Sequence, residues 1–383
     1  MRKLIKLEKS DNIVFNQNIT EFLASEEIYM PIKNNYQLLV KTNDYVLKDQ
    51  IIMENNLNKV VSPVSGFVGD IQTKNVDDVF LKCLNIHNDF KEKSKLVKRK
   101  ESAFTKDTLI NKLYEYYFKY IASVFENKKI NNLIISGLDD EPYILNNSYI
   151  LYKYSKEILE MTDILSTTFE INHTVIVMKN TQNKNIEKYL GKIGTYPNIG
   201  LSFVDDKYLL GNSFFLLEHL ECNEIDSFVI DVKSVLNMYE AIKYNRLPSE
   251  TFITISGPSV SKSQVLRVKL GTCLKEIIDN NVKIKDNDIQ FILNGLMTGH
   301  GCDITNVIVT NQTKGLVIIP NNKVEEQECN NCGLCYRICP VKVNPKRCMD
   351  KKIKSKNCID CGLCSYICPC HINLRRFLRS ENE

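Results

Sequence analysis

Eight of the fourteen cysteines in this 383-residue chain fall in two short segments of nearly identical pattern. Each segment reads Cys-x-x-Cys-x-x-Cys-x-x-x-Cys-Pro, first as CNNCGLCYRICP at 329–340 and again as CIDCGLCSYICP at 358–369. Three closely spaced cysteines on a loop can wrap around an iron–sulfur cubane, whereas the fourth has moved onto a helix that points away and binds the other cluster. The repeat therefore predicts two [4Fe–4S] clusters that exchange their fourth ligands.

This exchange fixes the predicted ligands of each cluster. The first cluster is assigned Cys329, Cys332, Cys335 and Cys368, and the second Cys358, Cys361, Cys364 and Cys339. Gly333 and Gly362 lie within the loops, where the backbone must bend closely around inorganic sulfur. The alternative is a pair of zinc sites, although zinc usually takes two Cys-x-x-Cys arms with a longer spacer. Cys348 and Cys370 flank the motifs and are expected to be bystanders.

Positive charge is concentrated around the second motif. The segment VKVNPKRCMDKKIKSKN at 341–357 carries seven Lys or Arg residues and one acid, and Arg375, Arg376 and Arg379 follow. Such a face could dock an acidic electron carrier such as a ferredoxin, steered by charge. A solvated surface beside negatively charged clusters explains the same residues, and the sequence leaves both explanations open.

The overall composition excludes several classes of protein. The net charge of +4 is small, so nucleic acid is not expected as a partner. No eighteen apolar residues run together, which predicts no membrane span, and MRKLIKLEKSD at the N-terminus lacks the apolar stretch of a signal peptide. We expect a cytoplasmic protein, a location that includes the inner face of the cell membrane, where thiols stay reduced and clustered cysteines bind metal.

The hydrophobic pattern upstream predicts further units that must position the cysteine region. Residues 35–72 read as short strands broken by turns, a small all-β unit, and a charged linker follows at 91–101. Its PVSG turn resembles that of the barrel-sandwich fold of biotinyl and lipoyl carriers. Asn55 and Asn56 stand where carriers have their modified lysine, so no swinging arm is expected.

Strands and helices alternate through the middle of the chain. Strands are expected at 132–137, 173–179, 200–205 and 227–231, and helical spacing at 107–127, 148–165, 184–192, 212–221 and 233–243. This alternation predicts a parallel α/β sheet. From 249 the order strand, strand, helix, strand, followed by NVIVT (306–310) and GLVIIP (315–320), predicts a compact α+β unit.

In this order of units, the chain resembles the RnfC family, the peripheral iron–sulfur subunit of the membrane-bound Rnf ferredoxin:NAD oxidoreductase, and related proteins such as that of the proline reductase system. NLIISGLDDEPYILNN at 132–147 is similar to the family's strand ending in G-A-E-C-E-P-Y, and FITISGPSVSKSQVLRVKLGTCLKEIID at 252–279 to its β-grasp (SLBB-type) segment. The resemblance implies a multidomain α/β fold. Its units would be an N-terminal barrel-sandwich hybrid with linker (1–100), a Rossmann-like parallel α/β domain related to FMN- and NADH-binding domains (101–246), a β-grasp unit (247–320) and a two-cluster ferredoxin module (321–383).

The chain departs from the flavin-binding members of that family. They carry a loop G-x-G-G-A-G-F-P-T, whose amides cradle the FMN phosphate, just before the strand that corresponds to 132–137. Here no glycine occurs from 70 to 136. Asp139 stands for the family's first acid, Asp140 for its cysteine, Asn147 for a later aspartate, and Gly211 stands alone where the family has a G-G-L-P turn. We therefore expect neither FMN nor NAD(H) to bind.

These observations favour a relay of single electrons through two [4Fe–4S] clusters, between a ferredoxin-type donor and a partner protein. The chain would be a component of a larger redox assembly, which could include membrane-bound Rnf-type subunits, with no catalytic residues of its own. Two alternatives stay open: a complete flavin-dependent NAD(H):ferredoxin oxidoreductase subunit, and an assembly scaffold of a redox complex.

Overall fold

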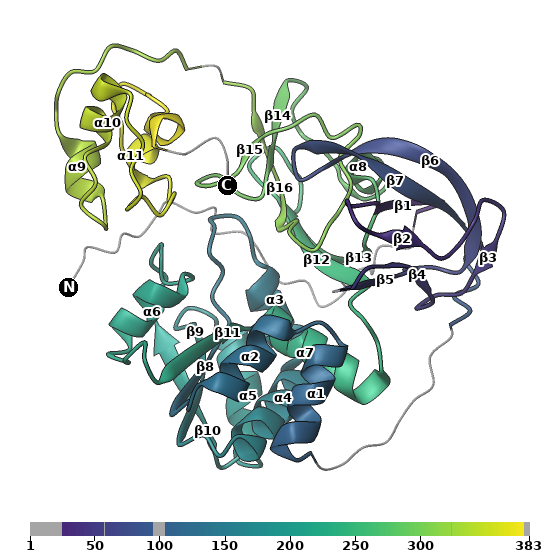
Figure 1. Ribbon diagram of the computed structural model, residues 1–383. Coiled ribbons are helices and arrows are strands. Elements are labelled where there is room, and N and C mark those ends of the chain that lie inside the picture. The colour runs from purple at the N-terminus through teal and green to yellow at the C-terminus, as the bar shows by residue number, and fades with distance from the viewer. Residues whose placement is uncertain (1–24, 57, 95–103, 323, 379–383) are drawn as a thin grey trace.

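A computed structural model describes residues 25–56, 58–94, 104–322 and 324–378, and Figure 1 shows their arrangement. Within these residues the chain is a mixed α/β protein whose strands form four sheets. The predicted mixed fold with a parallel sheet is confirmed, while the finer domain labels stay predictions. Residues 1–11, most of the charged linker at 91–101 and Arg379 lie outside the described residues.

Two small antiparallel sheets pack together in the N-terminal unit. The first has the order β1 (Glu27–Pro31), β7 (Val79–Asn88), β6 (Gly66–Val76), β3 (Tyr45–Val46), and the second β2 (Gln37–Leu38), β4 (Ile51–Glu54), β5 (Lys59–Val61). Val46 and Ile86 of the first sheet share one hydrophobic core with Ile52 and Met53 of the second. The strands expected over 35–72 are therefore present.

The middle unit is built on a four-stranded parallel sheet. Its strand order is β10 (Ile199–Val204), β9 (His173–Lys179), β8 (Asn132–Ser136), β11 (Ser227–Asp231). The chain runs from β8 outward to β10 and then returns to the other side of β8, so the order reverses between β8 and β11. Open parallel sheets bind ligands outside the carboxyl ends of the strands at such a reversal.

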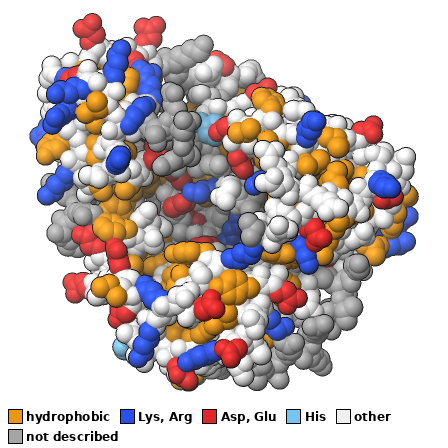
Figure 2. All heavy atoms as spheres, in the orientation of Figure 1, with side chains coloured by type: hydrophobic (Ala, Val, Ile, Leu, Met, Phe, Trp, Pro, Cys, Tyr) orange, Lys and Arg blue, Asp and Glu red, His pale blue; other side chains and the backbone are white. Residues whose placement is uncertain are grey.

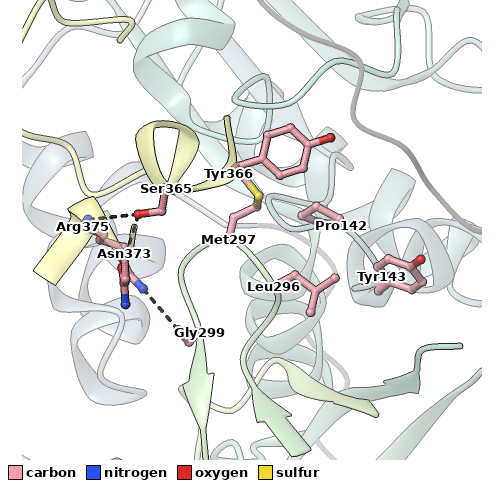
Figure 3. A pocket seen from close by; sticks show the side chains of 10 residues that line it. Pro142, Tyr143, Leu296, Met297, Gly299, Ser365, Tyr366, Asn373 and Arg375 are labelled. Carbon is pink, nitrogen blue, oxygen red and sulfur yellow. Dashed lines mark hydrogen bonds between the residues drawn. The ribbon is translucent and has the colours of Figure 1, made fainter. Parts of the chain in front are cut away.

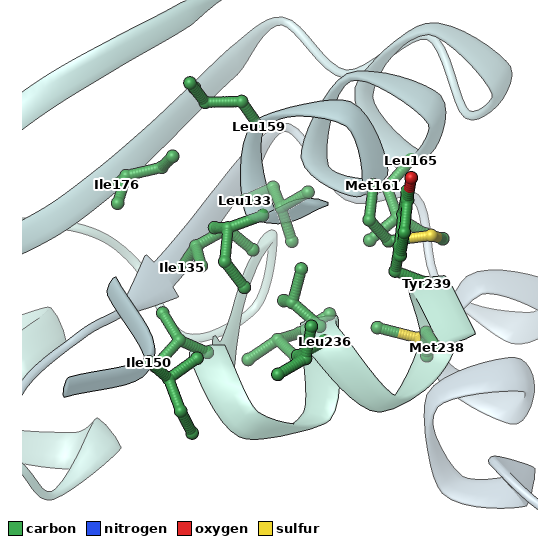
Figure 4. Packing of buried hydrophobic residues seen from close by; sticks show 14 of the residues in the cluster. Leu133, Ile135, Ile150, Leu159, Met161, Leu165, Ile176, Leu236, Met238 and Tyr239 are labelled. Carbon is green, nitrogen blue, oxygen red and sulfur yellow. The ribbon is translucent and has the colours of Figure 1, made fainter. Parts of the chain in front are cut away.

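Helices cover both faces of this sheet. They are α1 (Lys106–Glu115), α2 (Lys119–Asn127), α3 (Asn146–Lys153), α4 (Ser155–Thr168), α5 (Asn183–Ile193), α6 (Ser213–His219) and α7 (Val232–Tyr244). Alternate residues of a strand point to opposite faces. Leu133 and Ile135 of β8 accordingly join Leu159 of α4 and Leu236 of α7 in the larger core (Figure 4), whereas Ile134 joins the α6 side. Fully burying one such side chain stabilises a fold by about 1.5–3 kcal/mol.

Two of the expected helices are each divided in two. Residues 107–127 form α1 and α2, separated at Tyr117, whose φ of 66° is left-handed. Residues 148–165 fall in α3 and α4, which meet at the non-helical Tyr154. Tyr116 and Tyr154 keep hydrophobic contacts beside these breaks, so the apolar spacing runs across them and hides them.

The third unit is a five-stranded mixed sheet with one packed helix, α8 (Leu274–Asn281). Its order is β13 (Gln264–Lys269), β12 (Glu250–Ser256), β16 (Gly315–Pro320), β14 (Ile289–Leu293), β15 (His300–Gly301), with β12 and β16 parallel and the other pairs antiparallel. GLVIIP forms β16, whereas NVIVT (306–310) belongs to no strand. Val307 and Ile308 make only isolated bridges, to Asn75 and Cys273, although both are buried.

The cysteine motifs lie in a small C-terminal unit of short helices, beside the carboxyl edge of the parallel sheet (Figure 1). These helices are α9 (Leu334–Ile338), α10 (Pro345–Lys351), α11 (Leu363–Tyr366) and the 3₁₀ helix η1 (Leu374–Phe377). No helix of the described residues has the length and hydropathy that a bilayer crossing requires.

Candidate iron–sulfur site and the adjoining cavity

The two cysteine motifs fold locally in the same way. Helices α9 and α11 begin directly after Gly333 and Gly362, whose φ angles of 72° and 76° are left-handed. A residue with a Cβ pays about 1–2 kcal/mol in that conformation, so glycine is the residue suited to this bend. In each motif two cysteines precede the glycine on the loop, and the third lies in the first turn of the helix, at Cys335 and Cys364.

The thiols form neighbouring groups. Burial raises the pKa of Cys335, and the nearby Cys329 and Cys332 raise it further. Burial likewise raises the pKa of Cys361 to about 11, with additional effects from Cys339 and Cys358. Cys339, the last cysteine of the first motif, lines one pocket with Cys358, Cys361 and Cys364 of the second motif, and the ligand exchange stays a prediction.

Cys368, the predicted exchanged ligand of the first cluster, is not positioned next to the first motif alone. Cys368 packs in the hydrophobic cluster that contains Cys329 and Cys335, but the same cluster also contains Cys339 and Cys358. The position of Cys368 thus leaves its cluster assignment a prediction. No three His, Cys, Asp or Glu side chains of the described residues are grouped closely enough to hold a single metal ion.

Several thiols have local hydrogen bonds or apolar surroundings. The Val343 N–H donates to Cys339 Sγ at 3.2 Å and the Asp360 N–H to Cys358 Sγ at 3.4 Å. Hydrogen bonds to cluster sulfurs are one means by which proteins set reduction potentials. Cys348 and Cys370 are buried in the hydrophobic cluster of this unit together with the predicted ligand Cys364, so their bystander role stays a prediction.

The cysteines of the second motif are more enclosed than those of the first, although Tyr366 of the second motif is as exposed as Tyr336 of the first. Cys332 and Tyr336 of the first motif are exposed, whereas Cys364 and Leu363 of the second are buried. The Tyr208 hydroxyl donates to the Cys361 carbonyl oxygen at 2.7 Å, which ties the second motif to the parallel-sheet unit.

A loop of the third unit, residues 294–299, holds the second motif from another side. Buried Glu141 accepts hydrogen bonds from the Met297 and Thr298 amides, both at 3.0 Å. The Met297 carbonyl oxygen in turn lies where a Cβ on Gly362 would sit. Sequence reasoning placed Glu141 in a motif but missed this loop; the paired glycines in NGLMTG (294–299) were the available signal.

Figure 3 shows the pocket where these segments meet. It encloses about 290 Å³ between Tyr143, Met297, Tyr366 and Arg375. The Arg375 guanidinium donates to the Gly299 carbonyl oxygen at 3.2 Å and forms an ion pair with Asp360. This ion pair and the Gly299 contact fix the second motif against the 294–299 loop.

A larger cavity lies at the carboxyl ends of β8 and β11, where the strand order reverses. It encloses about 520 Å³ and extends from Asp139 and Asp231 to Tyr208 and Cys361. Its walls therefore join the edge of the parallel sheet to a predicted ligand of the second cluster. This is the place where an α/β sheet of this kind binds a ligand.

Two of the helix N-termini at this edge, those of α3 and α7, hold carboxylates, whereas that of α6 is capped by the Asn212 side chain. Asp139 accepts from the Asn147 and Ser148 amides at the start of α3, at 2.9 and 3.3 Å, and Asp231 accepts from the Ser234 amide of α7 at 2.9 Å. Such amides are the groups that bind phosphate in nucleotide sites. The segment that precedes β8, where the flavin-binding relatives carry their glycine-rich loop, instead forms α1 and α2, packed into the core.

A buried lysine balances one of these carboxylates. Lys179 Nζ lies 3.6 Å from Asp139 and 3.4 Å from Asp206. Burial acts to lower the pKa of Lys179, but the two carboxylates outweigh it and hold this pKa above its usual value. Asp139 is thus committed to internal partners rather than presented to a ligand.

The parallel-sheet unit and the overall fold are similar to those of known proteins. Residues 115–242 match the family described as the Nuo51 FMN-binding domain. The fold is similar to that of a chain of an NAD+-reducing [NiFe]-hydrogenase in its H2-reduced state, with a TM-score of 0.50 and 9% identity over 74% of this chain and 64% of that one.

Curated relatives match over longer stretches of sequence. The chain is 24% identical to the RnfC protein of the ion-translocating oxidoreductase complex of Buchnera aphidicola subsp. Baizongia pistaciae, covering 90% of this chain and 76% of the relative. It is 22% identical to the corresponding protein of the proton-translocating ferredoxin:NAD(+) oxidoreductase complex of Clostridium ljungdahlii, over 57% of this chain and 50% of the relative. The resemblance noted in the sequence is thereby confirmed, and the chain is a homologue of the RnfC proteins of these complexes.

Proposed function

We propose that this chain is an iron–sulfur electron-transfer subunit that relays single electrons between a ferredoxin-type donor and a partner protein. The observation that carries the proposal is the repeated cysteine motif on two equivalent glycine-initiated helices, with Cys339 placed beside Cys358 and Cys361. Two [4Fe–4S] clusters would supply the one-electron capacity. The chain's own residues would hold the clusters, tune them through hydrogen bonds and shield one of them from water.

The ligand sets are those that the motif predicts. Cys329, Cys332, Cys335 and Cys368 would hold the first cluster, and Cys358, Cys361, Cys364 and Cys339 the second. Burial raises the pKa of Cys364 to about 12, so its thiol is protonated at neutral pH in the absence of iron. Binding of iron by such thiols releases their protons.

The other units would form the body of the subunit. We assign a barrel-sandwich unit to 1–100, a degenerate FMN/NADH-type domain to 101–246, a β-grasp SLBB-like unit to 247–320 and the ferredoxin-like module to 321–383. The relatives are named as subunits of ion-translocating complexes. On the basis of that relationship, we propose that this chain assembles with Rnf-type subunits on the inner face of the membrane.

We further propose that the cavity beside the parallel sheet binds neither FMN nor NAD(H). Two of its helix N-termini, those of α3 and α7, are capped by Asp139 and Asp231, whose carboxylates occupy amides that a phosphate would need. Lys314, one of the cations of the cavity, is paired with Asp140. No segment of the described residues supplies the glycine-rich amide cradle of the flavin-binding relatives.

A flavin-dependent NADH oxidoreductase subunit is the second candidate function. The match of 115–242 to an FMN-binding domain favours it, as does a 520 Å³ cavity at the strand-order reversal. The two candidates differ in one property that is simple to measure. Flavin released on denaturation at about one per chain, with bleaching of the clusters by NADH, would establish the second candidate and overturn the first.

Cofactor analysis of protein purified without oxygen tests the relay. It should contain about eight irons and eight sulfides per chain, with no stoichiometric flavin, and should give the EPR signals of reduced [4Fe–4S] clusters. Fewer than about four irons per chain would end the proposal. An assembly scaffold would instead retain its partners in pull-down after Cys332 and Cys361 are replaced.

A further inference from the structure

We infer that the two clusters have different positions in the relay: the first is the outward terminal, and the charged surface around it docks an acidic one-electron carrier protein. This surface, the basic face, consists of Arg337, Lys342, Arg347, Lys351, Lys352 and Lys356. The inference rests on the proposed function, because a docking face beside the first motif has a purpose only if that motif holds a redox centre. The inference specifies which cluster would accept the electron and which side chains would bind the donor protein.

The basic face borders the first motif, although α10 also packs against η1, which follows the second motif. Helix α10, which carries Arg347 and Lys351, packs against α9 of the first motif. Arg337 of α9 reaches the first motif directly, because its guanidinium donates to the Cys332 carbonyl oxygen at 3.1 Å. Figure 2 shows Lys and Arg side chains gathered over this C-terminal unit.

The charges of the basic face are not neutralised within the described part of the chain. Asp350, the only acid in 341–357, pairs with Lys346. No other described carboxylate lies within ion-pair distance of the six residues of the basic face. An excess of exposed positive charge raises the association rate of an acidic partner and makes that rate sensitive to salt.

Two apolar side chains and one thiol are also exposed in the segment that carries the basic face. Tyr336 is 49% exposed and Ile353 is 45% exposed, and Cys332 is exposed between the ends of its loop. Protein interfaces combine an apolar centre with a polar or charged rim. A redox partner that covers Tyr336 would place its own centre close to the first cluster.

The cysteines of the second motif are less accessible, although Tyr366 beside them is exposed. Tyr208 bonds to the Cys361 carbonyl, Met297 packs on Gly362, and Cys364 is buried. A donor on the basic face would therefore reduce the first cluster, and the electron would then pass to the second. In that step one electron leaves the reduced carrier and enters the oxidised first cluster; no bond forms and no proton moves.

The experiment compares two double variants that each remove two positive charges. Arg347→Gln with Lys351→Gln alters the basic face on α10, and neither side chain has an ion pair among the described residues. Lys283→Gln with Lys285→Gln alters two exposed lysines of the third unit and is the matched control. The donor is a reduced ferredoxin with an acidic surface, and stopped-flow absorbance follows cluster reduction in full-length protein at several salt concentrations.

We expect the basic-face variant to lose about tenfold in second-order rate at low salt and to show a flatter salt dependence, because it is less strongly steered. The control should stay within about twofold of the unaltered protein. Iron content and EPR spectra measured on the same samples should be unchanged in both variants.

Other outcomes would overturn the inference. Equal rates for both variants would show that the basic face does not receive the carrier. Loss of binding to vesicles rich in phosphatidylglycerol, with an unchanged electron-transfer rate, would assign the basic face to the membrane instead. If the unaltered protein holds no clusters, the iron analysis shows that the proposed function has failed, and the inference falls with it. Clusters present with a salt-independent rate would overturn the inference alone.

Discussion

The cysteines of the C-terminal unit have different neighbours. Cys361 borders the large cavity, lies near Cys339 and Cys358, and has its carbonyl fixed by Tyr208. Cys348 is buried among Val343, Leu374 and other apolar side chains of the same unit. The motif spacing predicts these two classes, because a ligand must stand at a set distance from its companions while a small buried hydrophobe need not; the assignment stays a prediction, since Cys364, a predicted ligand, is buried in the same cluster as Cys348. The contact with Tyr208 was not predictable, because it joins residues 153 positions apart.

Replacing Cys361 by Ala should remove about half of the bound iron, because one of two clusters loses a ligand. Cys348→Ala is the matched control, since it removes another thiol from the same unit and should leave iron and sulfide unchanged. Both are measured by iron and sulfide analysis and by EPR of the reduced variants. Equal iron loss in the two variants, or none in either, would contradict the ligand assignment.

At the scale of elements, sequence pattern predicted most of the strands and helices but not the places where neighbours meet. The parallel sheet is confirmed because its strands are short β-branched runs between amphipathic helices. The breaks at Tyr117 and Tyr154 were hidden by side chains that stay in the core across them. The role of the 294–299 loop depends on its contacts with Glu141 and Gly362, which no local pattern encodes.

The two motif glycines allow this contact to be tested. Gly362→Ala and Gly333→Ala both place an L side chain in a left-handed conformation, which costs about 1–2 kcal/mol. Only at Gly362 does the added Cβ also overlap the Met297 carbonyl; near Gly333 the space is open. Hydrogen exchange of the amides at 296–299 should therefore speed up in Gly362→Ala and stay unchanged in Gly333→Ala. Unchanged exchange in both variants would show that the loop does not depend on Gly362.

At the scale of the whole molecule, a partly buried ionic cluster joins three of the units. Glu250 of β12 bonds to Arg267 and Lys269 of β13 at 2.6 Å each, and to Arg246 after α7 at 2.7 Å. Lys269 lies 3.3 Å from Glu92 of the N-terminal unit. Burial acts to raise the pKa of Glu250, but Arg267, Arg246 and Lys269 hold it far below its usual value.

Glu250→Gln should destabilise the protein at pH 7 by about 3–5 kcal/mol, because it leaves buried cations without their shared carboxylate. Glu224→Gln on an exposed turn is the control and should change stability by less than about 0.5 kcal/mol. A carboxylate with a lowered folded-state pKa stabilises above its unfolded pKa, and this contribution is lost as the pH falls below about 4. The difference in free energy of unfolding between Glu250→Gln and the unaltered protein should thus become smaller in acid, as measured by urea unfolding at each pH. A difference that does not change with pH would show that the ionised form of Glu250 does not stabilise the fold.

The central claim is that two iron–sulfur clusters, without a flavin, make this chain an electron relay. The most direct measurement is the joint content of iron, acid-labile sulfide and flavin in full-length protein purified without oxygen. We predict about eight irons and eight sulfides per chain and no stoichiometric flavin. About one flavin per chain, or fewer than about four irons, would contradict it.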